Sequence, residues 1–115
     1  MIETCLFCRI ARGEIPAKIA YQDEEFVALH DIDPKAPTHI LVVPRRHIRS
    51  VSALEEADAN LAGRLLLTGR RVAAETGVDR SGYRLVLNTG ADAGQSVDHI
   101  HLHVLGGRHM AWPPG

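Results

Sequence analysis

The sequence predicts one α+β domain over residues 1–115, a five-stranded antiparallel sheet with one long helix and a short N-terminal helix. Three observations support this fold class. Five short segments with apolar runs or apolar alternation are separated by turn residues, as strands are. Residues 53–76 repeat apolar side chains at helical spacing. A chain of 115 residues is long enough for one hydrophobic core and too short for two.

The first helix and the first three strands are predicted from the N-terminal half of the chain. Residues 5–13 read as a short helix that ends at Gly13. On a helix, Cys5 and Cys8 lie one turn apart and face the same way. Three segments have the pattern of strands: 17–21, 26–30 and 39–43. The last of them is continuously apolar, which indicates a central strand buried on both faces.

The long helix and the last two strands are predicted from the C-terminal half. Ser52-Ala53-Leu54-Glu55 has the pattern of a capping box and opens a helix over residues 53–76, which Gly77 ends. Residues 83–88 form the fourth strand, and a loop of small residues follows. The fifth strand is predicted over residues 98–104, where polar and apolar residues alternate strictly.

Composition excludes several classes of function. The formal net charge is −1, whereas a protein that tracks nucleic-acid phosphates carries a marked basic excess, so we expect no nucleic-acid partner. The first residues lack the basic and apolar regions of a signal peptide, and no apolar run approaches the length of a membrane span. We therefore expect a cytoplasmic protein with no membrane partner. Two cysteines three residues apart then favour thiols or a metal over a disulfide.

The fifth predicted strand places three imidazoles in one row. His99, His101 and His103 alternate with apolar residues, so their side chains point to the same face of the strand. Imidazole titrates near neutral pH, binds metals and can act as a nucleophile. The preceding Gly94-Gln95-Ser96 turn offers backbone and side-chain donors that suit a phosphate. An anion held there would lie over the row, with His101 as the best-placed nucleophile.

Several further segments carry a resemblance to a known family. The run His99-Ile100-His101-Leu102-His103-Val104-Leu105 matches the signature of the histidine triad (HIT) proteins. The chain resembles their Hint-like purine nucleoside phosphoramidase branch, through these segments: Ile15-Pro16-Ala17-Lys18, His30-Asp31-Ile32, Ala36-Pro37-Thr38-His39, Gly94-Gln95-Ser96-Val97 and Trp112-Pro113-Pro114-Gly115.

The resemblance implies a reaction and partners. Members of this branch hydrolyse the P–N bond of purine nucleoside phosphoramidates, and also acyl or aminoacyl adenylates. They form a covalent nucleotidyl-histidine and release AMP or GMP, without an organic cofactor. They are homodimers in which two five-stranded sheets join. The partners implied here are therefore purine nucleoside monophosphates, their phosphoramidates or adenylates, and a second copy of the chain.

The resemblance also implies roles for individual residues. His101 is the expected nucleophile, and His103 and Ser96 contact the phosphate and the leaving group, with support from His39. Asp31 accepts hydrogen bonds from both ribose hydroxyls. Phosphate positioning is assigned to Asn88, Gly94 and Gln95. The base slot is assigned to Leu6, Phe7, Ile10, Leu29 and Ile32, with His30 beside it. The tail with Trp112 reaches toward the partner's site.

A zinc site is the last implication. Some bacterial and more distant relatives hold zinc with a pair of cysteines and two histidines, and the matching residues are Cys5, Cys8, His47 and His99, the first histidine of the triad. Such a Cys₂His₂ set suits structural zinc. Simpler interpretations stay open: two reduced thiols, Leu6, Phe7 and Ile10 as plain core, Asp31 as a turn residue, and Trp112 as a cap on the dimer.

Other functions compete with the phosphoramidase. The pocket could belong to a purine-nucleotide-binding interaction module with incidental turnover. It could also hydrolyse or phosphorolyse dinucleoside polyphosphates, as other triad branches do. A zinc hydrolase that uses a metal-bound water is a third alternative. Retention of a nucleophile, which binding does not need, favours an enzyme.

Overall fold

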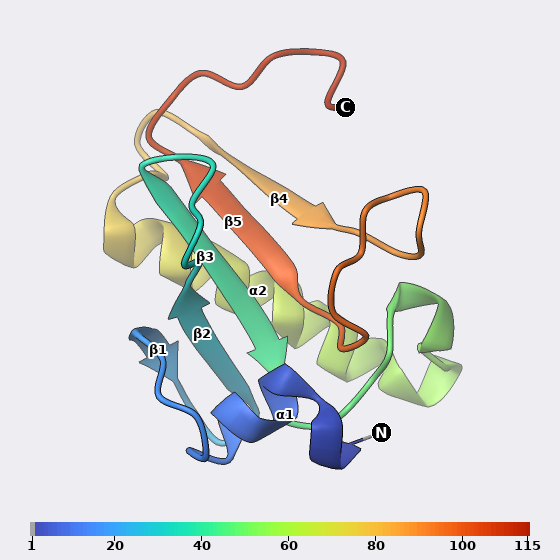
Figure 1. The fold of residues 1–115 in the computed structure, drawn as a ribbon. Helices are drawn as coiled ribbons and strands as arrows, with labels where there is room; N and C mark the ends of the chain where they lie inside the picture. The colour runs from blue at the N-terminus through green and yellow to red at the C-terminus, as the bar shows by residue number, and fades with distance from the viewer. Residues whose placement is uncertain (1) are drawn as a thin grey trace.

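The computed structural model describes residues 2–115 and contains the predicted α+β fold. Its sheet has the strand order β1-β2-β3-β5-β4, and every neighbouring pair is antiparallel (Figure 1). The strands are β1 (Ile19–Gln22), β2 (Phe26–His30), β3 (Thr38–Pro44), β4 (Tyr83–Leu87) and β5 (Leu102–Gly106). The helices are α1 (Leu6–Ala11) and α2 (Ala59–Thr76), with short 3₁₀ turns at Ile2–Thr4, Val51–Ala53 and Glu56–Asp58.

The two faces of the sheet carry separate apolar clusters. On one face, α2 packs over alternate residues of the strands, including Ile40, Val42 and Leu102. On the other face, α1 contributes Phe7 and Cys8, which pack with strand residues of the opposite alternation, such as Leu41 and Val43. Strand β3 is central and is buried along nearly its whole length, as its apolar run predicts.

The long helix begins later than the sequence pattern predicts. The chain is extended at Leu54, and α2 starts only at Ala59. The predicted capping box at Ser52 and Glu55 is wrong, because Glu55 and Asp58 form the box instead. The Glu55 N–H donates to Asp58 Oδ2 at 2.9 Å. The end of the helix is confirmed, since Gly77 follows Thr76 with a φ of 83°, which a residue with a side chain rarely adopts.

The fifth strand is also shorter at its start than predicted. Strand β5 begins at Leu102, so only His103 of the triad lies within the paired strand, and His101 directly precedes it. The Ile100 N–H donates to the carbonyl of Ile48 at 2.7 Å, so the segment around His99 pairs with the chain beyond β3 rather than with the ladder. Strict alternation of polar and apolar residues predicts an extended segment. It does not show whether that segment pairs along its length with a strand of the sheet or makes a single hydrogen bond to another part of the chain.

Among the described residues, neither helix has the length and apolar character to cross a membrane.

Candidate active site and metal centre

The expected nucleophile is held in one tautomer by a backbone contact. His101 is buried, and its Nδ1 lies 2.7 Å from the carbonyl oxygen of His99. A carbonyl only accepts, so Nδ1 carries the ring proton of neutral His101 and Nε2 keeps its lone pair. The ring of Phe7 packs edge-on against the imidazole, with centroids 5.1 Å apart, and fixes its orientation. His101 can therefore attack through Nε2.

His103, two residues after His101, is held as a hydrogen-bond donor by a chain that runs from the Lys35 N–H through His39. The Lys35 N–H donates to His39 Nδ1 at 3.0 Å, so His39 carries its proton on Nε2. That proton faces His103 Nδ1 at 2.9 Å, which leaves the ring proton of His103 on Nε2. His103 Nε2 is buried and has no hydrogen-bond partner within the described residues. An unpaired buried donor is costly, and a ligand oxygen or nitrogen would satisfy it.

Burial keeps His103 neutral. Desolvation, followed by the nearby rings of His101 and His39, lowers the pKa of His103 to about 4. Burial also lowers the pKa of His39. Both imidazoles are therefore uncharged near neutral pH, and each presents one donor and one acceptor.

Asp31 uses its two carboxylate oxygens differently. Oδ1 accepts the N–H of Asp33 at 2.8 Å. This hydrogen bond is the one expected if Asp31 is a turn residue. Oδ2 lies 3.4 Å from His39 Nε2. Asp31 thus stands next to the His39–His103 pair, where the resemblance expects the ribose hydroxyls to bind.

The loop before the triad is braced by Gln95. Its Oε1 accepts the Gly90 N–H at 2.9 Å, and its Nε2 donates to the carbonyls of Arg49 and Val97 at 2.8 and 3.1 Å. The N–H groups of Gly94 and Gln95 are bonded within the loop, to the carbonyls of residues 91 and 90. These two amides are therefore engaged within the loop, and phosphate binding by the Gly94-Gln95-Ser96 turn stays a prediction. Ser96 is exposed and makes no hydrogen bond among the described residues, so it is available to a ligand.

The residues expected to form the base slot are partly core and partly exposed. Phe7 and Leu29 are buried in the cluster under α1, as the core interpretation predicts for Phe7. Leu6 is exposed and Ile32 fully so. Ile10 and His30 are half-buried, and so is Asn88, which was assigned to the phosphate rather than to the base slot. Trp112 is exposed on the tail beyond β5.

The four expected metal ligands meet in one cluster. His99 Nδ1 lies 3.3 Å from Cys5 Sγ, 3.4 Å from Cys8 Sγ and 3.2 Å from His47 Nδ1, and His47 Nδ1 lies 3.2 Å from Cys8 Sγ. Ligand atoms around tetrahedral zinc, at bond lengths of roughly 2.0–2.3 Å, are separated by similar distances. The His99 Nε2–H donates to the carbonyl of Pro44 at 2.7 Å, so the Nδ1 lone pair points at the thiols. These residues fit a zinc ion.

The same reasoning excludes a second cluster as a metal site. Asp31, His39 and His103 also bring possible ligand atoms together. His39 Nδ1, however, accepts the Lys35 N–H, so its Nε2 carries a proton and has no lone pair for a metal. Two backbone groups decide which cluster can bind a metal: the N–H of Lys35, which contacts His39, and the carbonyl of Pro44, which contacts His99. Sequence reasoning missed both residues, because main-chain groups leave no side-chain pattern.

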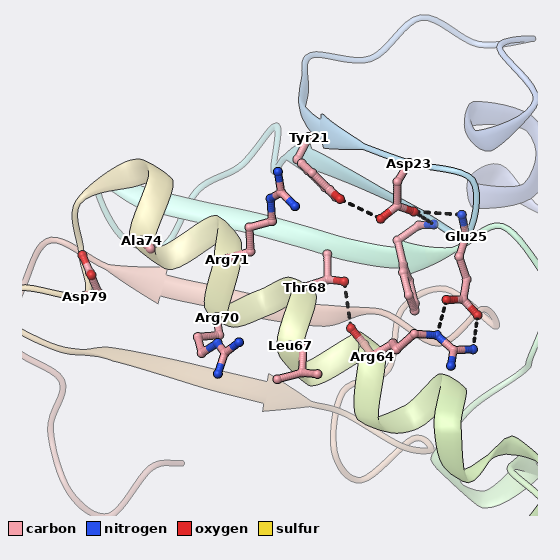
Figure 2. Close-up of a pocket in the computed structure, with 11 residues that line it drawn as sticks. Tyr21, Asp23, Glu25, Arg64, Leu67, Thr68, Arg70, Arg71, Ala74 and Asp79 are labelled. Atoms are coloured by element: carbon pink, nitrogen blue, oxygen red, sulfur yellow. Dashed lines mark hydrogen bonds and ion pairs between the residues drawn. The ribbon is translucent and has the colours of Figure 1, made fainter.

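A cavity on the α2 side of the sheet is a weaker candidate. It measures about 670 Å³ and lies between α2 and the β1–β2 turn (Figure 2). Two polar pairs lie within it: Arg64 contacts Glu25 at 2.5 and 2.7 Å, and the Tyr21 hydroxyl donates to Asp23 at 2.7 Å. None of the predicted site residues lines this cavity, so the histidine cluster is the stronger candidate.

Comparison with known proteins places the chain in a family. The model of the HIT domain matches residues 12–110. The chain belongs to the HIT family. A crystal structure of a HIT family hydrolase from Legionella pneumophila is 46% identical, with a TM-score of 0.95 over 97% of this chain and 100% of that one.

Two other similar structures are of a zinc-bound and a nucleotide-binding histidine triad protein. A zinc-bound histidine triad family protein from Mycobacterium smegmatis is 34% identical, with a TM-score of 0.80 over 95% of this chain and 78% of that one. A histidine triad nucleotide-binding protein from Candida albicans is 26% identical, with a TM-score of 0.81 over 96% of this chain and 83% of that one. The HIT fold of this chain thus occurs in hydrolases, in nucleotide-binding proteins and with zinc.

Proposed function

We propose that this HIT protein hydrolyses the P–N bond of purine nucleoside phosphoramidates, and related acyl or aminoacyl adenylates, through a nucleotidyl-histidine. The observation that best supports the proposal is the position of the proton on two neighbouring imidazoles, His101 and His103. His101 keeps a lone pair on Nε2, and His103 presents an unpaired N–H. A nucleophile beside a proton donor is what cleavage of a P–N bond needs.

In the first step, His101 Nε2 attacks phosphorus and the P–N bond breaks. The departing amine takes its electron pair and one proton, which water supplies through the Ser96 hydroxyl, while the neutral His103 ring donates a hydrogen bond through Nε2–H to the departing nitrogen or a phosphoryl oxygen. In the second step, water attacks phosphorus and the bond to His101 breaks. The water leaves one proton in the site, where it restores the donor, and the nucleoside monophosphate is released.

The test is intact mass spectrometry after rapid mixing with an adenosine phosphoramidate. The wild type should gain the mass of one adenylyl group, and the His101→Asn variant should not, while it still binds AMP. His109→Asn, at an exposed histidine outside the triad, is the matched control and should form the adduct normally.

Other outcomes would replace the proposal. AMP binding by the wild type with neither adduct nor turnover would favour the nucleotide-binding module. Preference for a dinucleoside polyphosphate would favour the other triad branches. Loss of turnover after zinc removal, in a protein that stays folded, would favour a metal-bound water.

We also propose that Cys5, Cys8, His47 and His99 hold a structural zinc ion. Four protein ligands leave no open position for substrate, so bound zinc would supply a cross-link and no chemistry at phosphorus. The cross-link would join the start of α1 to the segment after β3 and the segment before β5. Free thiols at such a site suit the reducing cytoplasm, which we infer as the compartment.

We further propose that the protein acts as a homodimer. Strand β4 lies at an edge of the sheet, so its outer backbone groups have no strand partner within residues 2–115. Leu66 and Leu67 of α2 and Leu87 at the end of β4 are exposed apolar side chains. Burial of that surface and pairing of the edge would favour association. Sedimentation equilibrium should give twice the chain mass, and a monomer at assay concentration would refute this.

A further inference from the structure

A cavity of about 500 Å³ borders both the metal centre and the loop that carries Ser96. Its walls come from the start of α1, from the segment after β3 and from the segment before β5. The lining residues are Thr4, Cys5, Leu6, His47, Arg49, Ser96, Val97 and Asp98. The proposed function puts the leaving group beside the Ser96 hydroxyl. A group that departs there would therefore enter this cavity and meet the other side chains of its walls.

Arg49 and Asp98 place opposite charges on the wall of this cavity. Arg49 Nη2 lies 3.8 Å from Asp98 Oδ2, and the two side chains are 73% and 69% exposed. Such a pair is weak, because water and salt screen it and its atoms are too far apart for a hydrogen bond. Neither side chain makes a hydrogen bond within residues 2–115. Both charges are therefore available to a ligand at little cost.

The main chain holds these two charged residues at fixed positions. The carbonyl of Arg49 accepts a hydrogen bond from Gln95 Nε2 at 2.8 Å. The carbonyl of Ile48, one residue earlier, accepts the Ile100 N–H at 2.7 Å. Gln95 and Ile100 lie on either side of Asp98 in the sequence, so these two contacts tie the segment with Arg49 to the segment with Asp98. The backbone is thus set, while the exposed side chains can adjust to a ligand.

We propose that Arg49 and Asp98 select the leaving group by charge, and that the favoured leaving group carries both a carboxylate and an ammonium. The inference rests on the proposed function and names its substrate class. An amino acid joined to phosphorus through its side-chain nitrogen keeps both groups, because its α-amino and α-carboxyl groups stay free. The carboxylate suits the paired N–H donors of the Arg49 guanidinium, and the ammonium suits Asp98.

A leaving group with only one of the two charges fits less well. A carboxylate alone would approach Arg49 with the carboxylate of Asp98 beside it. An ammonium alone would approach Asp98 with the guanidinium of Arg49 beside it. Like charges repel in both cases, so only a group with both charges leaves every charge with an opposite neighbour.

Other parts of the wall suit the chain that links the reacting nitrogen to the charged groups. Leu6 is exposed, and Val97 is half-buried and packs against the cluster under α1. Methylene groups of a leaving amine would cover these apolar side chains. Arg49 and Asp98 also line a neighbouring cavity of about 560 Å³, which leaves room for a charged end group beside them.

The test compares adenosine phosphoramidates of four leaving amines. Lysine is joined through its side-chain nitrogen; diaminopentane lacks the carboxylate, aminohexanoate lacks the ammonium, and pentylamine lacks both. With the wild type, kcat/KM for the lysine compound should exceed each of the others by about fivefold, the size expected for an exposed charge contact. Equal kcat/KM values for the lysine compound and either singly charged compound would overturn the inference.

Variants assign each charge to its residue. Arg49→Gln should bring the ratio of kcat/KM for lysine over diaminopentane close to one, and Asp98→Asn should do the same for lysine over aminohexanoate. Each ratio is taken within one variant, so a general loss of activity cancels. Arg80→Gln and Asp92→Asn, at exposed positions outside this cavity, are the matched controls and should keep the wild-type ratios. Wild-type ratios in Arg49→Gln and Asp98→Asn would refute the assignment.

Salt separates recognition of charge from recognition of shape. Raising sodium chloride from about 0.05 M to about 1 M should bring the wild-type ratios close to one, because salt screens exposed charges. A preference for lysine that persists unchanged at high salt would overturn the inference. Absence of both adduct and turnover with all four compounds would instead refute the proposed function.

Discussion

His99 Nε2 donates to the carbonyl oxygen of Pro44 at 2.7 Å, and this contact turns the Nδ1 lone pair of His99 toward Cys5 and Cys8. A main-chain acceptor at the end of β3 thus decides which ring nitrogen can bind a metal. Burial lowers the pKa of His99 to about 4, so the ring stays neutral and available as a ligand. Burial, and then Cys5, raises the pKa of the Cys8 thiol to about 11, so metal binding must displace a proton.

We expect Cys8→Ser to abolish zinc binding. A hydroxyl is a poor zinc ligand, so elemental analysis should fall from about one zinc per chain to nearly none. The melting temperature should also fall, because the cross-link between α1 and the segment before β5 is lost. His109→Ala, which removes an exposed histidine outside the cluster, should keep its zinc. A full complement of zinc in Cys8→Ser would exclude this site.

Stability should decrease in mild acid because of His103. The ordinary pKa of 6.5 applies to the unfolded chain, and the folded value is about 4. Between these values the unfolded state binds a proton that the folded state does not, so the free energy of unfolding falls as the pH falls from 6.5 toward 4. The contribution is fully present above pH 6.5, and because solvent screens this partly buried ring, its loss is well below the about 3 kcal/mol that the full shift would give.

Urea denaturation at about pH 7.5 and about pH 5 measures this effect. His103→Asn should show a smaller loss of stability between the two conditions than the wild type. His109→Asn, at an exposed position, should behave like the wild type. An unchanged pH dependence in His103→Asn would contradict the assigned cause.

Two glycines of α2 should respond in opposite ways to alanine. A Cβ at Gly69 would come within 2.7 Å of Leu102 Cδ2, and Leu102 lies between His101 and His103 in the sequence. Overpacking should destabilise Gly69→Ala by about 1–2 kcal/mol and lower turnover. At exposed Gly63 a Cβ meets nothing within 4 Å, so Gly63→Ala should stabilise the helix by about 0.5–1 kcal/mol. Equal stability of both variants would show that the Leu102 side chain moves to accommodate the added methyl group, and would contradict the predicted overpacking.

Gln95→Ala should loosen the loop that carries Ser96. The variant loses three hydrogen bonds that tie Gly90, Arg49 and Val97 together. Amide exchange at Gly90 should accelerate, and kcat/KM should fall by about tenfold or more, because the Ser96 hydroxyl is no longer held in place. Asp92→Ala, at an exposed position of the same loop, is the control. Unchanged exchange at Gly90 would mean that the backbone alone orders the loop.

Local pattern was sufficient for most of the fold. Continuous apolar residues marked β3 as the central strand, and Gly77 marked the end of α2. The starts of α2 and β5 were less predictable. Several acidic residues before α2 could each cap a helix, and the alternating residues before β5 suit any extended segment. Glu55, rather than Ser52, begins the capping box, and Ile100 pairs with Ile48 instead of joining the ladder. Such choices depend on contacts between segments distant in sequence.

The sequence by itself determined which side chains could do chemistry: three alternating histidines, a Cys-x-x-Cys pair and a glycine turn. Only the tertiary structure decided which nitrogen of each ring carries a proton. That choice is made by the carbonyls of Pro44 and His99 and by the N–H of Lys35. Every residue except proline has both main-chain groups, so residue identity does not reveal which of them will meet a histidine. The fold alone brings them within hydrogen-bonding distance.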